Sequence, residues 1–193
     1  MAIPATDQLK EQLRLERERL SRRQTRHRIR LVLLPLLLAG GLFLLFRLAV
    51  GFDVVSGNSM YPSLQDGDVV LYSRLAGTPG HGDIIVFTQD GRDTVKRVAA
   101  LPGDTVEIDP SSGQVAVNGV PLEEPYVTVG GGTGPGRPQT VLDSYVYVLG
   151  DNRKVSLDSR DSSIGTIQMD HILGRVIAVF RAVGPADRLE ATQ

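Results

Sequence analysis

The sequence contains no cysteine among its 193 residues, which excludes disulfides, a thiolate nucleophile and cysteine-ligated metal sites. Only 5% of the residues are aromatic and 21 are glycine, so we expect many turns around a modest core of aliphatic side chains. No phosphate-loop pattern and no cluster of metal ligands is found in the sequence. We therefore expect neither a metal nor a nucleotide cofactor.

The formal net charge of −1 hides an uneven distribution of charge. Residues 1–30 hold nine Lys/Arg and four Asp/Glu, a net of +5, and the remaining residues have a net of −6. The basic residues gather in one terminal arm, which is not a nucleic-acid-binding pattern, so we expect no nucleic acid partner. Over residues 7–30 a thin leucine stripe indicates a charged helix, either solvated and partly disordered or lying on anionic lipid headgroups.

A long apolar run follows the basic arm. The run from Leu31 to Phe46 is unbroken, and continuing it to Phe52 gives 22 residues, about 33 Å as a helix, which matches a bilayer core. A cleaved signal peptide is the alternative, but the preceding basic region is long for one and no convincing cleavage site follows. We predict an uncleaved transmembrane anchor over 31–52, with residues 1–30 as a cytoplasmic arm and the rest on the extracytoplasmic face.

Short strand patterns separated by turns fill the rest of the chain. Because strands and helices do not alternate, a parallel α/β fold is disfavoured. We expect a mainly β, antiparallel, partly barrel-like domain over 53–184, followed by a tail over 185–193. Asp90-Gly91 and Asn118-Gly119 are typical hairpin turns, and Gly130–Pro138 is a Gly/Pro-rich loop. The expected strands are Asp68–Tyr72, Asp83–Thr88, Thr94–Leu101, Val106–Ile108, Gln114–Val117, Ser144–Leu149 and Ile172–Phe180.

One short stretch near the start of this domain has the features of a nucleophile site. Gly57 permits backbone angles that other residues avoid, and Pro62 restricts both itself and the residue before it. Ser59 between them therefore lies on a stiff, turn-flanked segment. A serine between glycine and proline is also an ordinary turn residue, so this stretch alone does not decide between the two readings.

A nucleophilic serine needs a base, and the candidates are few. His27 lies on the other side of the predicted membrane, and His81 and His171 are interpreted as surface residues in loops. Lys96 shares a strand face with apolar neighbours, and burial of that face would lower the pKa of its amine. A neutral lysine can accept a proton from serine, whereas on an exposed edge strand Lys96 would be an ordinary surface charge.

Four segments together resemble the type I signal peptidases, most closely the small Gram-positive-type members. The first resembles the family's serine box, commonly Ser-Gly-x-Ser-Met-x-Pro-Thr-Leu, with Ser63 in place of threonine. The other three follow in the family's order, and the resemblance runs from about Leu31 to Val179. These four segments, called boxes below, are in order Ser56–Leu64, Gly82–Phe87, Lys96–Asp104 and Gly150–Arg160.

The resemblance implies a role for particular residues. Ser59 would be the nucleophile and Lys96 its base, Ser156 would hydrogen-bond the lysine amine, and Asp158 would pair with Arg160 to hold the loop. The backbone N–H of Ser59 would stabilise the oxyanion. Some members place a serine hydroxyl two residues before the nucleophile, where this chain has glycine.

The resemblance also implies the substrate and the setting. The family cleaves signal peptides of exported preproteins at the membrane, after small residues at the first and third positions before the cut. An extended peptide could bind by strand addition, with Asp83–Thr88 as a candidate strand. Met60 and Tyr61 would either touch lipid or belong to a pocket or the core.

Two other classes of protein compete with this interpretation. A non-catalytic anchored β-domain would bind peptides without turnover. A self-cleaving repressor-type protease shares the Ser/Lys chemistry but needs an N-terminal DNA-binding unit. The first thirty residues are too short for such a unit, and the apolar run would have no role in such a protein.

Overall fold

The computed structural model describes Arg14, residues 31–127, Gly134 and residues 137–181. The chain divides into two compact units, Met1–Arg47 and Leu48–Gln193. Apart from Arg14, Gly134 and residues 137–138, the predicted basic arm, the Gly/Pro-rich loop and the tail over 185–193 lie outside the described residues. The apolar helix Leu31–Ala49 is long and apolar enough to cross a membrane.

The helix ends three residues earlier than the sequence predicts. Residues 50–52, assigned above to the anchor, instead begin strand β1 (Val50–Val54), which pairs with β2 (Val69–Ser73). Gly51 lies opposite Tyr72 in this pairing, and a Cβ at Gly51 would fall 2.2 Å from the tyrosine ring. The apolar residues at the end of the run therefore contribute to the sheet.

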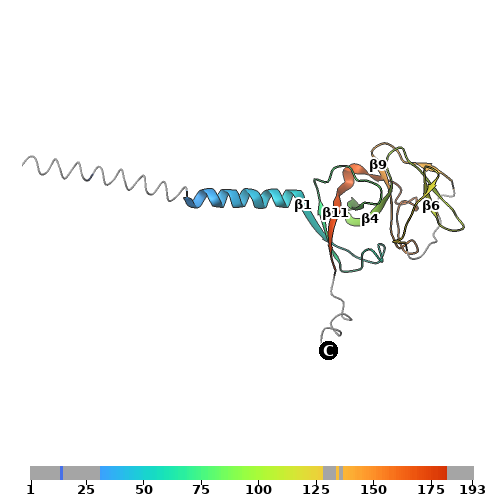
Figure 1. The fold of residues 1–193 in the computed structure, drawn as a ribbon, viewed down its shortest axis with the longest axis horizontal. Coiled ribbons are helices and arrows are strands. Elements are labelled where there is room, and N and C mark those ends of the chain that lie inside the picture. Colours follow the sequence, from blue (N-terminus) through green and yellow to red (C-terminus); the bar gives the residue numbers. More distant parts are fainter. Residues whose placement is uncertain (1–13, 15–30, 128–133, 135–136, 182–193) are drawn as a thin grey trace, which may run out of the picture. The chain divides into compact units, whose positions relative to one another are not determined.

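The larger of two sheets has its strands in the order β1-β2-β11-β3-β4-β9-β10 in the described residues, and every pairing is antiparallel. It is open, with β1 and β10 at its edges. Figure 1 labels β1, β4, β9 and β11 of this sheet. Its remaining strands are β3 (Ile84–Gln89), β4 (Arg92–Ala100), β9 (Tyr145–Leu149), β10 (Ile167–Gln168) and β11 (Ile172–Phe180).

The smaller sheet has the order β7-β6-β5-β8 among the described residues, and Figure 1 labels its strand β6. A short 3₁₀ helix, η1 (Met169–His171), precedes β11. The prediction of a mainly β, antiparallel domain with one N-terminal apolar helix is confirmed. The strands of the smaller sheet are β5 (Thr105–Ile108), β6 (Val115–Val117), β7 (Val120–Pro121) and β8 (Gln139–Thr140).

Both predicted tight turns form hairpins. Asp90 and Gly91, with φ of 50° and 74°, connect β3 to β4, and Asn118 and Gly119, with φ of 54° and 79°, connect β6 to β7. Left-handed angles at both central residues match the right-handed twist of the flanking strands. The first hairpin matters for function, because it sets the register of β4.

The β3–β4 hairpin is packed on both faces. Val86 and Val95 belong to one buried cluster, and Ile85, Phe87 and Val98 belong to another. β3 itself pairs with β11 on one side and with β4 on the other. The suggestion that Asp83–Thr88 receives a substrate strand is therefore wrong, because an interior strand has no free edge to offer.

Candidate active site

The turn that carries Ser59 is anchored by its apolar neighbours. Met60 and Leu64 are buried in the cluster that contains Val86 and Val95. The N–H of Leu64 donates to the carbonyl of Met60 at 2.9 Å. Met60 is thus a core residue, and the hydroxyl of Ser59 is held in place by the packing of the residues that follow it.

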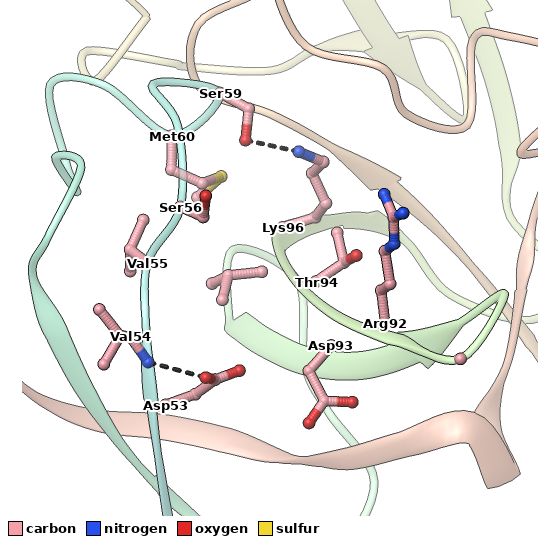
Figure 2. Close-up of a pocket in the computed structure, with 12 residues that line it drawn as sticks. Asp53, Val54, Val55, Ser56, Ser59, Met60, Arg92, Asp93, Thr94 and Lys96 are labelled. Atoms are coloured by element: carbon pink, nitrogen blue, oxygen red, sulfur yellow. Dashed lines mark hydrogen bonds between the residues drawn. The ribbon is translucent and has the colours of Figure 1, made fainter.

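Lys96 reaches this serine from strand β4. Its side chain is buried, with 4% of the residue exposed, and Nζ donates to Oγ of Ser59 at 2.6 Å (Figure 2). Lys96 pairs with Ile85 of β3, but β9 begins to pair with β4 only at Arg97. Lys96 is therefore the last residue of the part of β4 that pairs with β3 alone, and the unpaired edge of β4 faces Ser59 there.

Burial changes the acidity of this amine. Desolvation lowers the pKa of Lys96 from its ordinary value of 10.5 to about 8, with the negative charge of Asp158 opposing the shift and the positive charge of Arg160 adding to it. An amine with a pKa near 8 is substantially neutral at slightly alkaline pH. It can then accept a proton from the hydroxyl that it contacts.

The ion pair predicted in the last box is present. Arg160 donates through Nε to Oδ1 of Asp158 at 2.8 Å, and Asp158 also accepts from the N–H of Gly150 at 3.0 Å. The guanidinium donates further to the carbonyls of Arg153, at 2.9 Å, and Ser156, at 3.3 Å. Asp158 is almost fully buried, so this pair fixes the loop against the end of β9.

The predicted hydrogen bond from Ser156 to the lysine amine is wrong. The Ser156 hydroxyl is buried and has no hydrogen-bond partner in the described residues. It lies instead against Gly150, where a Cβ would come within 2.1 Å of it. The amine of Lys96 is directed at Ser59. The Asn152 N–H donates to the Ser59 carbonyl at 3.0 Å and so holds the loop against the turn that carries Ser59.

A second arginine, Arg97, which sequence reasoning did not assign, joins its own box to the other three. Arg97 donates to both carboxylate oxygens of Asp151, at 2.8 and 2.7 Å, to the Gly82 carbonyl at 2.9 Å and to the Ser63 hydroxyl at 3.1 Å. The ring of Tyr126 lies 3.9 Å from its guanidinium carbon. The signal that could have indicated this role is the place of Arg97 in the third box, directly after Lys96.

The remaining basic candidates lie on the surface, as predicted. His81 contacts Asp104 at 2.6 Å with half of its side chain exposed, and His171 is more exposed still. Lys154 is exposed in its turn. Neither histidine lines the cavity beside Ser59. Among the described residues, no group of three or more acidic or histidine side chains could hold a metal ion.

A cavity of about 450 Å³ opens beside Ser59 and Lys96. Figure 2 shows β1 and the residues after it along one side and β4 along the other. β1 is an edge strand, and residues 92–96 pair only with β3, so both sides present unpaired backbone. The cavity is lined by Asp53, Val54, Val55, Ser56, Ser59, Met60, Gly91, Arg92, Asp93, Thr94, Val95 and Lys96.

The N–H of Ser59 is free to act as a donor. It makes no hydrogen bond within the part of the chain that the structure describes. Its neighbour Gly57 is not an alternative donor, because the Gly57 N–H already donates to Asp66 at 2.7 Å. Ser59 thus offers both a hydroxyl in contact with Lys96 and an unsatisfied N–H.

Comparison with known proteins shows which family has this arrangement. The family model "Signal peptidase, peptidase S26" matches residues 26–181. The chain is 35% identical over 140 residues to signal peptidase I S of Bacillus subtilis, covering 66% of this chain and 74% of that one. It is 33% identical over 148 residues to signal peptidase I of Leptolyngbya laminosa, covering 70% and 69%.

A crystal structure of a signal peptidase I from Enterococcus faecalis is also similar, with 30% identity, a TM-score of 0.44, and coverage of 52% of this chain and 97% of that one. The family model spans more than half of the chain, and the Bacillus relative exceeds 30% identity over most of its own length. The chain therefore belongs to the signal peptidase family, peptidase S26, and is a serine endopeptidase.

Proposed function

We propose that this protein removes signal peptides from exported preproteins, using Ser59 as nucleophile and Lys96 as general base, and cuts after small residues. Family membership supports signal-peptide removal. The observation that carries the assignment of the dyad is the 2.6 Å contact between Nζ of buried Lys96 and Oγ of Ser59. A general base must lie within hydrogen-bond reach of the proton that it takes.

The chemistry follows from this contact. Neutral Lys96 takes the proton of Ser59 as Oγ forms a bond to the scissile carbonyl carbon, and the oxyanion lies at the Ser59 N–H. The resulting ammonium returns the proton to the leaving amine, and the C–N bond breaks to leave an ester on Ser59. A water molecule, deprotonated by Lys96, then hydrolyses the ester and frees the serine.

The supporting residues would keep the lysine where this transfer can occur. Asp158 and Arg160 hold the last box through their ion pair and the Gly150 N–H. Ser156, whose side chain packs against Gly150, would help to hold the same loop. We assign all three residues to positioning of the dyad.

The cavity beside the dyad would receive the substrate. An extended peptide placed between β1 and residues 92–96 would satisfy unpaired backbone groups on both sides. We propose the edges of β1 and of residues 92–96 as the peptide-binding edges, in place of Asp83–Thr88, which the sequence suggested. Val55, Met60 and Val95 form an apolar wall close to Ser59, which suits small apolar side chains next to the cut.

The apolar helix would anchor the enzyme in the bilayer. We propose that residues 1–30 remain in the cytoplasm and that the domain over 53–184, with the tail over 185–193, lies outside. The charge imbalance supports this orientation, since arginine-rich arms are retained on the cytoplasmic side. Lipid and signal-bearing preproteins are then the partners of the enzyme.

The dyad can be tested by substitution in the full-length protein in detergent. We expect Ser59→Ala and Lys96→Met each to lower processing of a purified preprotein by about 10³-fold or more, because residues of a catalytic unit fail together. Lys154→Met is the matched control, since Lys154 is exposed in a turn, and it should process normally. Processing by either dyad variant at the wild-type rate, with unfolding curves confirming a folded protein, would refute the assignment.

A non-catalytic peptide-binding domain is the other outcome that this experiment can detect. It would bind the preprotein without cleaving it, in the wild type and in both variants. Measuring bound and cleaved preprotein in the same reaction separates the two functions.

A further inference from the structure

A turn that leads out of the smaller sheet contacts two arginines beside the dyad and has no role in the mechanism above. The turn, over residues 124–127, follows β7 and is closed by the Val127 N–H, which donates to the Glu124 carbonyl at 3.0 Å. Pro125 occupies its second position, where the fixed φ of proline favours a turn. The side chains of Glu124 and Tyr126 therefore extend from a stiff segment.

Glu124 forms an ion pair with Arg153 of the last box. The pair is shielded from water, because the side chain of Arg153 is 3% exposed and that of Glu124 is 12% exposed. Arg153 also donates through Nε to the Gly150 carbonyl at 3.0 Å, and its own carbonyl accepts from Arg160 at 2.9 Å. Glu124 thus holds the arginine that fixes the peptide of Gly150, and Gly150 lies against the Ser59 carbonyl.

Tyr126 contacts the arginine that directly follows Lys96 in the sequence. The centre of its ring lies 3.9 Å from the guanidinium carbon of Arg97, which is a cation–π distance. The same guanidinium donates to both carboxylate oxygens of Asp151, a fully buried residue of the last box. The ring therefore packs on an ion pair that joins β4, one residue after Lys96, to the last box.

We infer that Glu124 and Tyr126 are positioning residues, which hold the last box and the end of β4 in the arrangement that keeps Lys96 buried against Ser59. This inference rests on the proposed function, and it makes the smaller sheet necessary for catalysis. None of residues 124–127 lines the cavity beside Ser59, so the turn does not contact a peptide bound there. Loss of either side chain should therefore lower kcat and leave KM near its wild-type value.

The surroundings of Lys96 provide a pH-dependent signature of this arrangement. Desolvation is the largest effect on its amine and lowers the pKa to about 8, and the charged groups that act on it all belong to the last box: Asp158, Arg160 and Asp151. A loosened last box would admit water to the amine, and relief of the desolvation would raise its pKa. The midpoint of the pH profile should then move to higher pH, which a loss of overall stability alone would not cause.

Glu124→Ala in the full-length enzyme tests the first contact. It leaves the buried charge of Arg153 without its carboxylate, which is strongly unfavourable. We expect kcat on a purified preprotein to fall about tenfold and the midpoint of kcat/KM to rise by about half a pH unit or more. Glu123→Ala, at the exposed neighbouring residue, is the matched control and should resemble the wild type in both measurements.

Two variants of Tyr126 test the second contact and remove no charge. Tyr126→Phe keeps the ring over Arg97 and loses a hydroxyl contact to Glu124 of 3.5 Å, which is long for a hydrogen bond. Its kcat should stay within about twofold of that of the wild type. Tyr126→Leu removes the ring and should lower kcat about fivefold, with a shift of the midpoint in the same direction as Glu124→Ala.

The outcomes separate positioning from a purely structural role. Wild-type kcat and midpoint in folded Glu124→Ala and Tyr126→Leu would overturn the inference, as would lower thermal stability with an unchanged midpoint. Equal activity of the two Tyr126 variants would also overturn it, and these variants decide the question if Glu124→Ala does not fold. If the wild type cleaves the preprotein no more than Ser59→Ala does, it is the proposed function that fails.

Discussion

Lys96 combines two properties that seldom occur together in a lysine: its side chain is buried, and its amine contacts a hydroxyl. Desolvation lowers its pKa to about 8, so the ammonium form predominates below that pH and cannot accept a proton. We expect kcat/KM to rise with pH and to reach half of its plateau near pH 8. A pH profile of preprotein processing between pH 6 and 10 checks this, and a midpoint near 6.5 would indicate a histidine base instead.

The same burial has a cost in stability. The folded state holds Lys96 with a pKa near 8, against 10.5 for the exposed group, so between these values the unfolded state binds more protons. The penalty is full below pH 8 and is relieved as the pH rises towards 10.5. Lys96→Met removes the charge, and we expect it to stabilise the protein by about 3 kcal/mol at pH 7.

Urea denaturation of the wild type and of Lys96→Met at pH 7 and pH 10 measures this effect. The difference in free energy of unfolding should shrink at the higher pH. A methionine variant that is less stable than the wild type at pH 7 would show that the lysine is not under a desolvation penalty. Lys154→Met, altered at an exposed site, should show no dependence on pH of this kind.

At this scale the sequence identifies residues better than it identifies contacts. Strand alternation grouped Lys96 with apolar neighbours on one strand face, and the box pattern indicated Ser59. The hydrogen bonds of Arg97 reach three segments that are distant in the sequence. The periodicity of a single strand cannot predict these partners. The orientation of the Ser156 hydroxyl depends on how its loop packs on Gly150, which local sequence does not determine.

Strand β9 and the loop after it bring the last box against the turn that carries Ser59. Their junction is Gly150, where a Cβ would meet the Ser59 carbonyl oxygen at 2.6 Å. That oxygen belongs to the backbone, so Gly150→Ala must displace the turn. We expect a loss of about 10²-fold in kcat, because small displacements of catalytic groups have effects of this size.

Gly80→Ala is the matched control for this substitution. A Cβ at Gly80 would meet only the Asp83 carboxylate, at an ordinary contact distance of 3.6 Å. Its activity on the same preprotein should remain near that of the wild type. Equal activity of the two alanine variants would show that the approach of Gly150 to Ser59 is not needed for catalysis.

Element boundaries were less predictable than element types. Ile172–Phe180 was predicted with the bounds that β11 has, and both tight turns were found from their Asx-Gly pairs. Residues 50–52 were misassigned because they continue the composition of the apolar run, and their pairing with β2 is a long-range contact. For the same reason the sequence could not show that β3 is interior, with β11 as its second neighbour.

Across the whole molecule, segments far apart in the sequence converge on one end of β4. Lys96 lies 37 residues from Ser59, and Arg97 lies 54 residues from Asp151. The order of the boxes along the chain predicted that they act together. The sequence did not show how they come together, because this depends on the antiparallel pairing of β4 with β3 on one side and β9 on the other.

The helix Leu31–Ala49 separates a basic arm from an acidic domain, and this difference in charge predicts the orientation in the membrane. In inverted vesicles, with the cytoplasmic face outside, added protease should remove an N-terminal epitope and leave the β-domain intact. Permeabilising the vesicles should then expose the domain. A β-domain digested in intact vesicles, with the N-terminal epitope protected, would reverse the topology and place Ser59 on the side from which preproteins have not yet been exported.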